Sequence, residues 1–431
     1  MDIQQTAIQA KSAAIQLAAV KSEVKNQALA EIAAALEKNK AEIAAANRAD
    51  LQRSEKEKLA APLLKRLKFD ESKIREACEG LKSLEKLADP VGETLTATEL
   101  DEGLELYKVS CPIGVIGVIF ESRPDALVQI SALCLKSGNA VLLKGGSEAA
   151  ETNRILAAVI HDAGVKAGIP KGWLALLETR ADVADMLKMD KHIDLIIPRG
   201  SNAFVRHIMD NTNIPVMGHA DGICHVYIDS KADPAMAVRI AVDSKTQYVA
   251  VCNAAETILV HKDIAAKVLP LLKDALEAKH VEIRGCEQTR KIIDAKVATE
   301  EDWRTEYLDL IVSVKVVDSL DGAVEHINCY GSGHTDVIVT EDRSRGIRFM
   351  DYVDSADVFL NCSSRFSDGF RFGLGAEVGI STGKIHARGP VGLEGLVIYK
   401  WRMFGNGHIV ADYAGSQAKP FTHRRLNKKS L

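Results

Sequence analysis

The sequence predicts an α/β protein with two doubly wound domains. From residue 114 onward, short segments rich in Val, Ile and Leu alternate with longer helical patterns, and a second series of this kind begins after residue 229. Such alternation is typical of parallel sheets flanked by helices. The first 88 residues are rich in Ala, Glu, Lys and Leu and nearly free of Gly and Pro, which predicts several amphipathic helices, for instance at residues 25–38 and 41–55.

The first alternating series supplies the elements of one doubly wound domain. Its apolar segments contain many β-branched residues, which favour strands. We expect strands at residues 115–120, 140–143, 174–177, 194–197, 214–217 and 224–228, and helices at residues 125–136, 148–167 and 202–210.

The second series predicts another α/β domain. We expect helices at residues 234–249, 263–278, 320–329 and 343–352, and strands at residues 257–260, 312–316, 336–339 and 356–360. No repeat with a period of 20 to 50 residues accompanies these elements, so a solenoid is excluded.

Composition and charge exclude several classes of function. A length of 431 residues predicts two or three domains, and 47% hydrophobic residues provide for real cores. A formal charge of −4 predicts no nucleic-acid partner, and the basic residues after position 423 are expected to be a solvated terminus. No segment approaches the roughly 18 uninterrupted apolar residues of a membrane span, and no signal peptide is evident. We therefore expect a cytoplasmic protein without a membrane partner.

The eight cysteines are scattered, which favours reduced thiols in the cytosol. They form no C-x-x-C pair and show no zinc-ligand spacing with any of the twelve histidines, so no metal site is predicted.

Cys252 is the most informative of these cysteines. It lies in VCNAAET, between a helical pattern and the strand expected at residues 257–260. A thiol at such an exposed junction can be ionised and aimed at an electrophile. Most cysteines are small buried hydrophobes, so the position alone does not decide between a nucleophile and a core residue.

Two strand-to-helix junctions carry signals for an anionic ligand. Lys144 ends a strand and Ser147 is placed to cap the next helix; Arg199 and Ser201 repeat this arrangement after the strand at residues 194–197. Ligands of α/β proteins bind at this carboxyl edge of the sheet. Neither G-x-G-x-x-G nor the P-loop pattern is present, so ordinary strand–turn–helix connections remain an alternative.

Longer motifs resemble one known family. Residues 317–338 read VDSLDGAVEHINCYGSGHTDVI and residues 384–396 read KIHARGPVGLEGL. Together with FESRPD, LLKGGSE, PRGS and VCNAAET, they resemble the gamma-glutamyl phosphate reductases, a branch of the aldehyde dehydrogenase superfamily. The resemblance extends over essentially the whole chain.

The resemblance implies an aldehyde dehydrogenase-like architecture. An NADP-binding domain is expected at residues 1–97 and 109–229 and a catalytic domain at residues 230–375. Residues 98–108 and 376–431 are expected to form a small β oligomerisation arm and the C-terminal segment. The implied reaction is the NADPH-dependent reduction of L-glutamate 5-phosphate to L-glutamate 5-semialdehyde, with release of phosphate, in L-proline biosynthesis.

Residue chemistry fits this reaction. The Cys252 thiolate attacks the acyl phosphate and expels phosphate, and hydride then reduces the resulting thioester. The backbone N–H of Cys252 and the Ser122 side chain are candidate oxyanion donors; oxidising relatives have Asn where Ser122 stands. Those relatives also activate water with a Glu, whereas residues 217–222 read MGHADG. Phosphate is therefore expected to exchange with the acyl-enzyme, and Asp221 is the alternative base.

The resemblance also implies cofactor contacts. Lys144 and Ser147 are expected near the adenosine ribose, Gly200 and Ser201 at the pyrophosphate with Arg199 beside them, and Glu306 at the nicotinamide ribose. Glu306 lies in TEYLD where the superfamily has E-I-F-G-P, so a surface carboxylate is its alternative reading.

The substrate carries a carboxylate, an ammonium group and a phosphate, so cations and hydroxyls are expected near Cys252. The candidates for contact with it are Arg123, Asn253, Ser332, His334 and Arg371. His326 fits a packed or capping histidine better than a catalyst.

Two other functions stay open at this point: a CoA-acylating aldehyde dehydrogenase, which would need a different acyl pocket, and a noncatalytic binding protein. The intact Cys252 motif and the GSGHTD segment favour the reductase. We expect a homo-oligomer, either a dimer or a dimer of dimers, and a possible transient contact with glutamate kinase.

Overall fold

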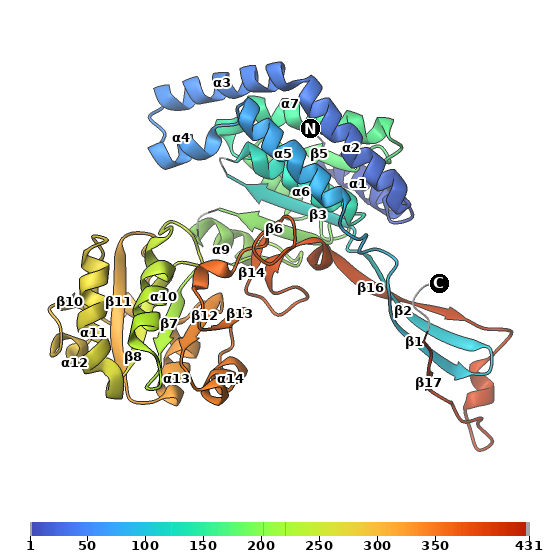
Figure 1. The fold of residues 1–431 in the computed structure, drawn as a ribbon. Helices are drawn as coiled ribbons and strands as arrows, with labels where there is room; N and C mark the ends of the chain where they lie inside the picture. The colour runs from blue at the N-terminus through green and yellow to red at the C-terminus, as the bar shows by residue number, and fades with distance from the viewer. Residues whose placement is uncertain (1, 122, 201, 220, 428–431) are drawn as a thin grey trace.

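The computed structural model describes residues 2–121, 123–200, 202–219 and 221–427, and it has three main parts (Figure 1). A four-stranded parallel sheet with its helices forms the first part and a seven-stranded parallel sheet forms the second. A four-stranded antiparallel sheet extends away from both. The α/β fold class predicted from the sequence is confirmed.

The first sheet has the strand order β5-β4-β3-β6. Its strands are β3 (Val115–Phe120), β4 (Ala140–Lys144), β5 (Leu174–Leu176) and β6 (Leu195–Arg199). All residues of β3 and β4 are buried, as expected for parallel strands that helices cover on both faces. The chain proceeds from β3 to one side and later returns to the other, so a crevice for ligands is expected where β3 meets β6.

Helices cover both faces of this sheet. Helix α1 (Ile3–Leu17) contributes Ile3, Ala10 and Ala14 to the core on one face. Helices α6 (Pro124–Lys136) and α7 (Ala150–Lys166) cover the other face, and α2 (Ser22–Lys38), α3 (Lys40–Lys56) and α5 (Glu71–Glu85) pack outside them. The remaining elements of this part are α4 (Ala61–Leu67), η1 (Ser147–Ala149), α8 (Arg180–Met186) and α9 (Asn202–Asp210).

The second sheet has the order β10-β9-β11-β8-β7-β12-β13. Its strands are β7 (Cys224–Ile228), β8 (Ala255–His261), β9 (Glu282–Gly285), β10 (Lys296–Val297), β11 (Ile311–Val317), β12 (Thr335–Val339) and β13 (Asp357–Leu360). The helical elements are α10 (Pro234–Thr246), α11 (Lys262–Glu277), α12 (Glu287–Arg290), η2 (Glu301–Arg304), α13 (Leu320–Tyr330), α14 (Arg343–Tyr352) and η3 (Ser364–Phe366).

Two expectations about these strands were wrong, and two short strands were not expected. Cys224–Ile228 does not belong to the first sheet: it pairs with β8 and β12, so the second sheet begins before the expected boundary at residue 229. Residues 214–217 form only an isolated bridge between Val216 and Ile196, because Pro215 has no N–H to donate. The short strands β9 and β10 were missed because their segments lack a long apolar run.

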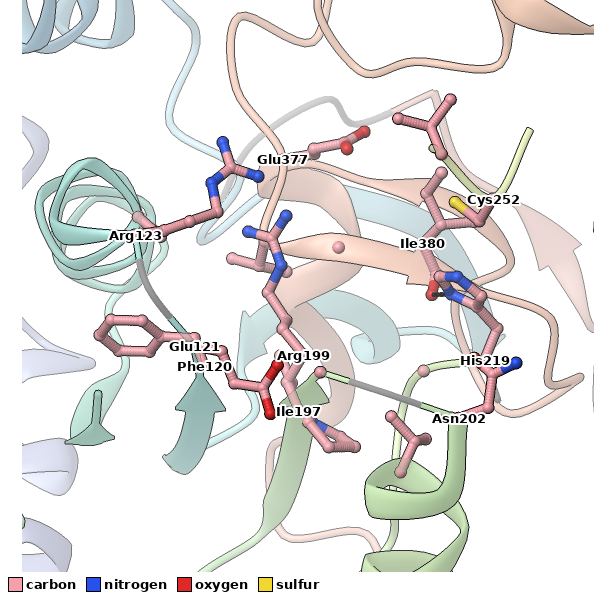
Figure 2. A pocket seen from close by; sticks show the side chains of 18 of the residues that line it. Phe120, Glu121, Arg123, Ile197, Arg199, Asn202, His219, Cys252, Glu377 and Ile380 are labelled. Atoms are coloured by element: carbon pink, nitrogen blue, oxygen red, sulfur yellow. Dashed lines mark hydrogen bonds between the residues drawn. The ribbon is translucent and has the colours of Figure 1, made fainter. Parts of the chain in front are cut away.

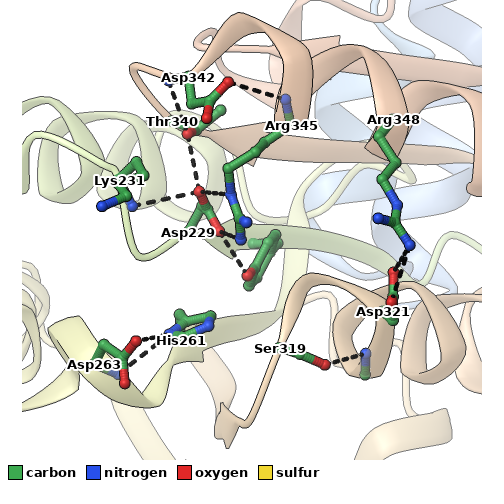
Figure 3. A network of polar contacts seen from close by, with 12 residues as sticks. Asp229, Lys231, His261, Asp263, Ser319, Asp321, Thr340, Asp342, Arg345 and Arg348 are labelled. Carbon is green, nitrogen blue, oxygen red and sulfur yellow. Dashed lines mark hydrogen bonds and ion pairs between the residues drawn. The ribbon is translucent and has the colours of Figure 1, made fainter.

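A buried polar network fixes the end of β7 (Figure 3). Asp229 is fully buried and accepts two hydrogen bonds from Arg345 at 2.6 and 2.7 Å. The hydroxyls of Thr340 and Tyr227 each donate to the same carboxylate at 2.9 Å. Burial opposes ionisation of Asp229, but the hydrogen bonds from Arg345 and the two hydroxyls outweigh it and hold the pKa of Asp229 below its ordinary value.

The antiparallel sheet forms an arm with the order β16-β2-β1-β17. Its strands are β1 (Thr94–Asp101), β2 (Leu104–Pro112), β16 (Val397–Phe404) and β17 (Arg424–Arg425), with η5 (Val410–Tyr413) at its far end. The hairpin is longer than the expected residues 98–108, because polar residues that alternate along β1 and β2 leave no long apolar signal.

The first part of the C-terminal segment does not lie in the arm. The two-stranded sheet of β14 (Gly379–Ser381) and β15 (Gly389–Val391) leads to η4 (Leu393–Leu396). Val378, Val391, Leu393 and Leu396 join the core between the first sheet and its outer helices. Among the described residues, no helix combines the length and apolar character needed to cross a bilayer.

Candidate active site

Cys252 lies in a turn between α10 and β8, as the sequence predicted. Asp233 caps α10 by accepting from the backbone of Met236, and Pro234 occupies the first turn, where no N–H is needed. At the other end of the turn, the Asn253 amide donates to the Ser367 carbonyl at 2.6 Å and the Ser364 hydroxyl donates to the Asn253 carbonyl at 2.7 Å. These contacts hold the thiol in one position.

Gly222 permits a close approach to this turn. A Cβ added at Gly222 would lie 2.3 Å from the carbonyl oxygen of Cys252 and 2.6 Å from Oε1 of Glu306. Only glycine fits there without displacing one of the two. The buried thiol of Cys224 also donates to the Cys252 carbonyl at 3.1 Å.

The charges around Cys252 set its acidity. Burial raises the pKa of the Cys252 thiol to about 12, and the carboxylates of Glu306 and Glu377 add to the rise. The Arg199 guanidinium acts in the opposite direction but does not cancel them. The free protein therefore holds Cys252 as a thiol at neutral pH, and attack on an electrophile requires a group that takes its proton.

Two histidines flank the sulfur. One ring nitrogen of His219, one of His334 and the Cys252 Sγ all lie within 4.8 Å of one another. The two rings meet edge to face with their centroids 4.9 Å apart. Figure 2 shows His219 beside Cys252 and Ile380, and Nδ1 of His219 lies 3.0 Å from the Ile380 carbonyl oxygen.

Cys252 opens into a cleft of about 650 Å³ between the two parallel sheets. Arg199, Arg123 and Glu377 gather in it (Figure 2). Burial lowers the pKa of Arg199, and the nearby positive charge of Arg123 lowers it further. Burial raises the pKa of Glu377, whose carboxylate accepts from the Gly369 backbone at 2.8 Å. Two guanidinium groups that repel each other in one cleft favour an anionic ligand.

Glu306 lines the same cleft, so its reading as a surface carboxylate is not supported. The Asn202 amide donates to Oε2 of Glu306 at 2.8 Å and to Oδ1 of Asp221 at 2.7 Å. Asn202 begins α9, shortly after β6, so it links the end of the first sheet to Glu306, which lies between β10 and β11 of the second sheet.

A second cleft of about 800 Å³ lies at the carboxyl ends of β3 and β4. Lys144, Ser147 and Arg180 line it, and Phe120 and Glu121 line both clefts, so the two clefts adjoin. Lys144 is nearly buried and donates to the Gly145 carbonyl, and burial lowers its pKa. A Cβ at Gly145 would lie 2.1 Å from the Asn153 amide nitrogen, which explains the glycine in this turn.

The structure brings most of the predicted site residues together. Lys144 and Ser147 share one cleft; Cys252, Arg123, Arg199, Gly200 and Glu306 share the other, and His334 lies beside Cys252. Ser122 and Ser201 lie outside the described residues.

Four predicted substrate residues do not line the Cys252 cleft, among them His334, which is buried beside Cys252. Asn253 turns its amide toward Ser367, and Arg371 is exposed, with Nη1 donating to the Arg365 carbonyl at 2.7 Å. Ser332 accepts from the Ile223 backbone at 2.9 Å and lines a separate cavity of about 370 Å³. The alternative base Asp221 lines that cavity as well. Sequence order alone could not show which way these side chains turn.

His219, Asn202 and Glu377 belong to the site, and sequence reasoning assigned none of them. His219 lies in MGHADG, the segment that has no Glu where oxidising relatives carry their catalytic Glu. A titratable residue in that segment was the signal that could have identified His219. No sequence pattern identified Asn202 or Glu377, because the residues that each of them contacts in the site are distant in the sequence. His326 is a packed histidine, as expected: burial, with His225 and Lys315 nearby, lowers its pKa to about 2.

Comparisons with known proteins decide the family. The family model described as "Aldehyde dehydrogenase family" matches residues 1–290. The gamma-glutamyl phosphate reductase of Pelotomaculum thermopropionicum is 69% identical over 428 residues, covering 99% of this chain and 98% of that protein. The chain belongs to the gamma-glutamyl phosphate reductase branch of the aldehyde dehydrogenase family. As a member of this family it is an oxidoreductase.

Other relatives of this branch agree. The gamma-glutamyl phosphate reductase of Acetivibrio thermocellus is 68% identical over 429 residues, covering 100% of this chain and 99% of that protein. The crystal structure of the gamma-glutamyl phosphate reductase from Thermotoga maritima matches with a TM-score of 0.93 and 40% identity, covering 95% of this chain and 100% of that one. An acetylating aldehyde dehydrogenase from Geobacillus thermoglucosidasius shares the fold at 19% identity, with a TM-score of 0.64 over 95% of this chain and 97% of that one.

Proposed function

We propose that this protein reduces L-glutamate 5-phosphate to L-glutamate 5-semialdehyde with NADPH, releases phosphate, and thereby serves L-proline biosynthesis in the cytoplasm. The observation that carries the proposal is Cys252 at the inner end of a cleft lined by cations, in a chain similar along its whole length to gamma-glutamyl phosphate reductases.

Cys252 is the nucleophile of the proposed reaction. Its thiol proton passes to a neighbouring imidazole, and the sulfur attacks the carbonyl carbon of the acyl phosphate. The bond from that carbon to the phosphate oxygen breaks, which leaves a thioester on Cys252 and free phosphate. When the thioester has been reduced, its carbon–sulfur bond breaks and the thiolate recovers a proton.

The surrounding residues position the substrate and stabilise charge. Arg199 and Arg123 are the groups to hold the phosphate as it leaves, since both guanidinium groups face the cleft of Cys252. The Cys252 backbone N–H and Ser122 are the proposed oxyanion donors. Ser332, in the neighbouring cavity, is a candidate for the polar end of the glutamyl group together with Arg206 and Arg304. Asn253 and Arg371 would act by holding the loops around Cys252.

The two adjoining clefts fit an extended dinucleotide. We assign the adenosine ribose to the cleft of Lys144 and Ser147, the pyrophosphate to Gly200, and the nicotinamide ribose to Glu306 in the cleft of Cys252. NADPH supplies the hydride when it is bound. Lys144, Arg180 and Lys188 line the cleft of about 800 Å³, and their positive charges support the 2′-phosphate of NADPH over NADH.

Phosphate, rather than water, is the proposed partner of the acyl-enzyme. Residues 217–222 supply no Glu to activate water, and Asp221 faces the other cavity, where its carboxylate accepts from Asn202. The first domain would bind the cofactor, the second carries the nucleophile, and the arm would join subunits of a homo-oligomer. A transient contact with glutamate kinase would shorten the path of the unstable acyl phosphate.

The reverse reaction tests this proposal without the labile acyl phosphate. Purified protein is mixed with glutamate 5-semialdehyde and NADP, with and without phosphate, beside a Cys252→Ala variant. We expect phosphate-dependent formation of NADPH that the variant lacks. Activity without phosphate would replace the proposal with a hydrolytic dehydrogenase, and activity that requires CoA would replace it with an acylating one.

A further inference from the structure

The proposed reaction needs one imidazole beside Cys252 to take the thiol proton, but two histidines flank the sulfur. His219, Cys252 and His334 come from three separate segments, and their ligating atoms lie within 4.8 Å of one another. His334 is fully buried, and its Nε2 has no hydrogen-bond partner among the described residues. An orphaned buried nitrogen costs free energy unless something else binds it.

The tautomer of His219 follows from its backbone contact. Its Nδ1 lies 3.0 Å from the carbonyl oxygen of Ile380, and a carbonyl only accepts. Nδ1 therefore carries the hydrogen, and Nε2 of the neutral ring keeps a free lone pair.

His334 contacts a neighbouring hydroxyl through its other ring nitrogen. Nδ1 of His334 lies 2.8 Å from Oγ1 of Thr335. In the tautomer whose Nδ1 donates to that oxygen, Nε2 of His334 also keeps a free lone pair.

The cluster is therefore made of acceptors. Two imidazole lone pairs and a sulfur gather without a donor among them apart from the thiol hydrogen, so a cation would satisfy all three at once. The backbone carbonyl behind His219 is an outer contact that metal-bound histidines usually make, and the Thr335 hydroxyl takes the corresponding place behind His334.

The ligand types select the metal. Two imidazoles and a thiolate suit zinc, whereas Mg²⁺ and Ca²⁺ require oxygen ligands, and the cluster has none. Zinc with three protein ligands keeps a fourth position for water, and the adjoining cleft of about 650 Å³ provides the space for it. Ligands of tetrahedral zinc lie about 3.5 Å apart, given bonds of about 2.0 to 2.3 Å, so the three side chains, whose ligating atoms lie within 4.8 Å of one another, close slightly around the metal.

We propose that His219, Cys252 and His334 form a reversible zinc site that withdraws the nucleophile from catalysis. A sulfur bound to zinc is not free to attack an acyl carbon, so metal and substrate exclude each other. Zinc binding releases the thiol proton of Cys252 and oxidises nothing. Removal of the metal by a chelator restores the thiol.

A cobalt titration of the purified full-length protein tests the site directly. Co²⁺ takes the place of Zn²⁺ and reports its own ligands through a sulfur-to-metal charge-transfer band and the visible bands of a tetrahedral ion. We expect one Co²⁺ per chain, displaced by Zn²⁺, with loss of the charge-transfer band in Cys252→Ser. Cys329→Ser removes an exposed thiol elsewhere and should leave the spectrum unchanged.

Two further variants separate ligation from folding. His219→Gln should weaken Zn²⁺ binding by more than about 100-fold, since a ligand counts for more than an outer contact. Thr335→Val keeps all three ligands but removes the contact behind His334, and it should weaken binding by about 10- to 100-fold. Unchanged affinity in both variants, or a charge-transfer band retained in Cys252→Ser, would overturn the proposal.

Inhibition supplies a second readout. Zn²⁺ should protect Cys252 from alkylation by iodoacetamide, and a chelator should remove the protection. Protection requires neither substrate nor cofactor, so it can be judged even if the proposed reductase activity fails. Alkylation of Cys252 at the same rate with and without stoichiometric Zn²⁺ would count against the site.

Discussion

At the scale of single residues, the site depends on side chains whose surroundings come from distant segments. The VCNAAET pattern identifies Cys252 as a candidate nucleophile, and the structure places Cys252 in the turn that this pattern predicts. Burial raises the pKa of its thiol most, and Glu306 and Glu377, which are 54 and 125 positions later in the chain, raise it further. No local pattern could have revealed that environment.

Gly222 provides a sharp test of how closely the backbone must approach Cys252. We expect Gly222→Ala to lower kcat of the proposed reaction about 100-fold, because the new Cβ displaces the Cys252 carbonyl or Glu306. Steady-state kinetics and the melting temperature of the variant are the measurements. Gly80→Ala is the matched control, since no atom lies within 4 Å of its added Cβ, and it should leave kcat unchanged. Equal kcat values in both variants would contradict the role of Gly222.

Arg180 tests the proposed preference for NADPH. In the reductase direction, Arg180→Ala should raise KM for NADPH about tenfold and leave KM for NADH nearly unchanged, because only NADPH has the 2′-phosphate. Lys166→Ala removes an exposed cation at the end of α7 and serves as the control. Equal increases in KM for NADPH and NADH would indicate that Arg180 contacts a group common to both cofactors rather than the 2′-phosphate.

At the scale of elements, the sequence predicted most helices and strands because their apolar patterns are long and regular. The β3 and α14 bounds agree with the expectation at both ends, and α10 ends three residues early, at Thr246. The errors lie where the pattern is ambiguous. The pattern of Cys224–Ile228 identifies a strand correctly, but it cannot say which sheet the strand joins, since both sheets are parallel and each contains fully buried strands.

The buried ion pair of Asp229 and Arg345 connects the end of β7 to α14, and its contribution to stability can be measured. We expect Asp229→Asn to lower the free energy of unfolding by about 2–4 kcal/mol, because it leaves Arg345 facing a buried neutral amide. Urea denaturation is the measurement. Arg348→Ala breaks an exposed ion pair with Asp321 in the same region and should cost at most about 1 kcal/mol (Figure 3). Similar losses in the two variants would contradict the importance of burial.

The same network predicts an acid response. Because the folded protein lowers the pKa of Asp229, its contribution to stability is fully present above the ordinary Asp pKa of about 4. It is lost as pH falls below that value toward the lowered pKa. We expect the stability difference between the protein and Asp229→Asn to be constant from about pH 5 to 7 and to shrink in stronger acid. A difference that grows in acid would have the wrong sign.

At the scale of the whole molecule, the arm exposes a row of apolar side chains. Tyr399, Trp401 and Met403 form this row on one face of β16, Ile398 and Phe404 are exposed on the other face, and β16 is an edge strand of its sheet. Exposed apolar edges of this length usually pair with another chain. The expectation of a homo-oligomer came from the family resemblance, and this surface supports it.

Trp401 tests the role of the arm. Trp401→Glu should shift the protein toward the mass of a single chain at micromolar concentration, because it places a charge in the apolar row. Size-exclusion chromatography with light scattering measures the mass. Val297→Glu, at an exposed apolar position on β10, is the control and should leave the mass unchanged. A single-chain mass in the unaltered protein would contradict the oligomer itself.

The path of the chain also sets an order for folding during synthesis. The core of the first part joins Leu17 of α1 with Leu393 and Leu396 of η4, so it lacks these last side chains until residue 396 has left the ribosome. The seven-stranded sheet uses one continuous stretch, from Cys224 to Leu360, and can close earlier. Domains usually complete their folding from the N-terminus onward. Here the second domain can complete its folding first. Until Leu393 and Leu396 are synthesised, the first domain keeps exposed the apolar surface that they cover in the folded protein.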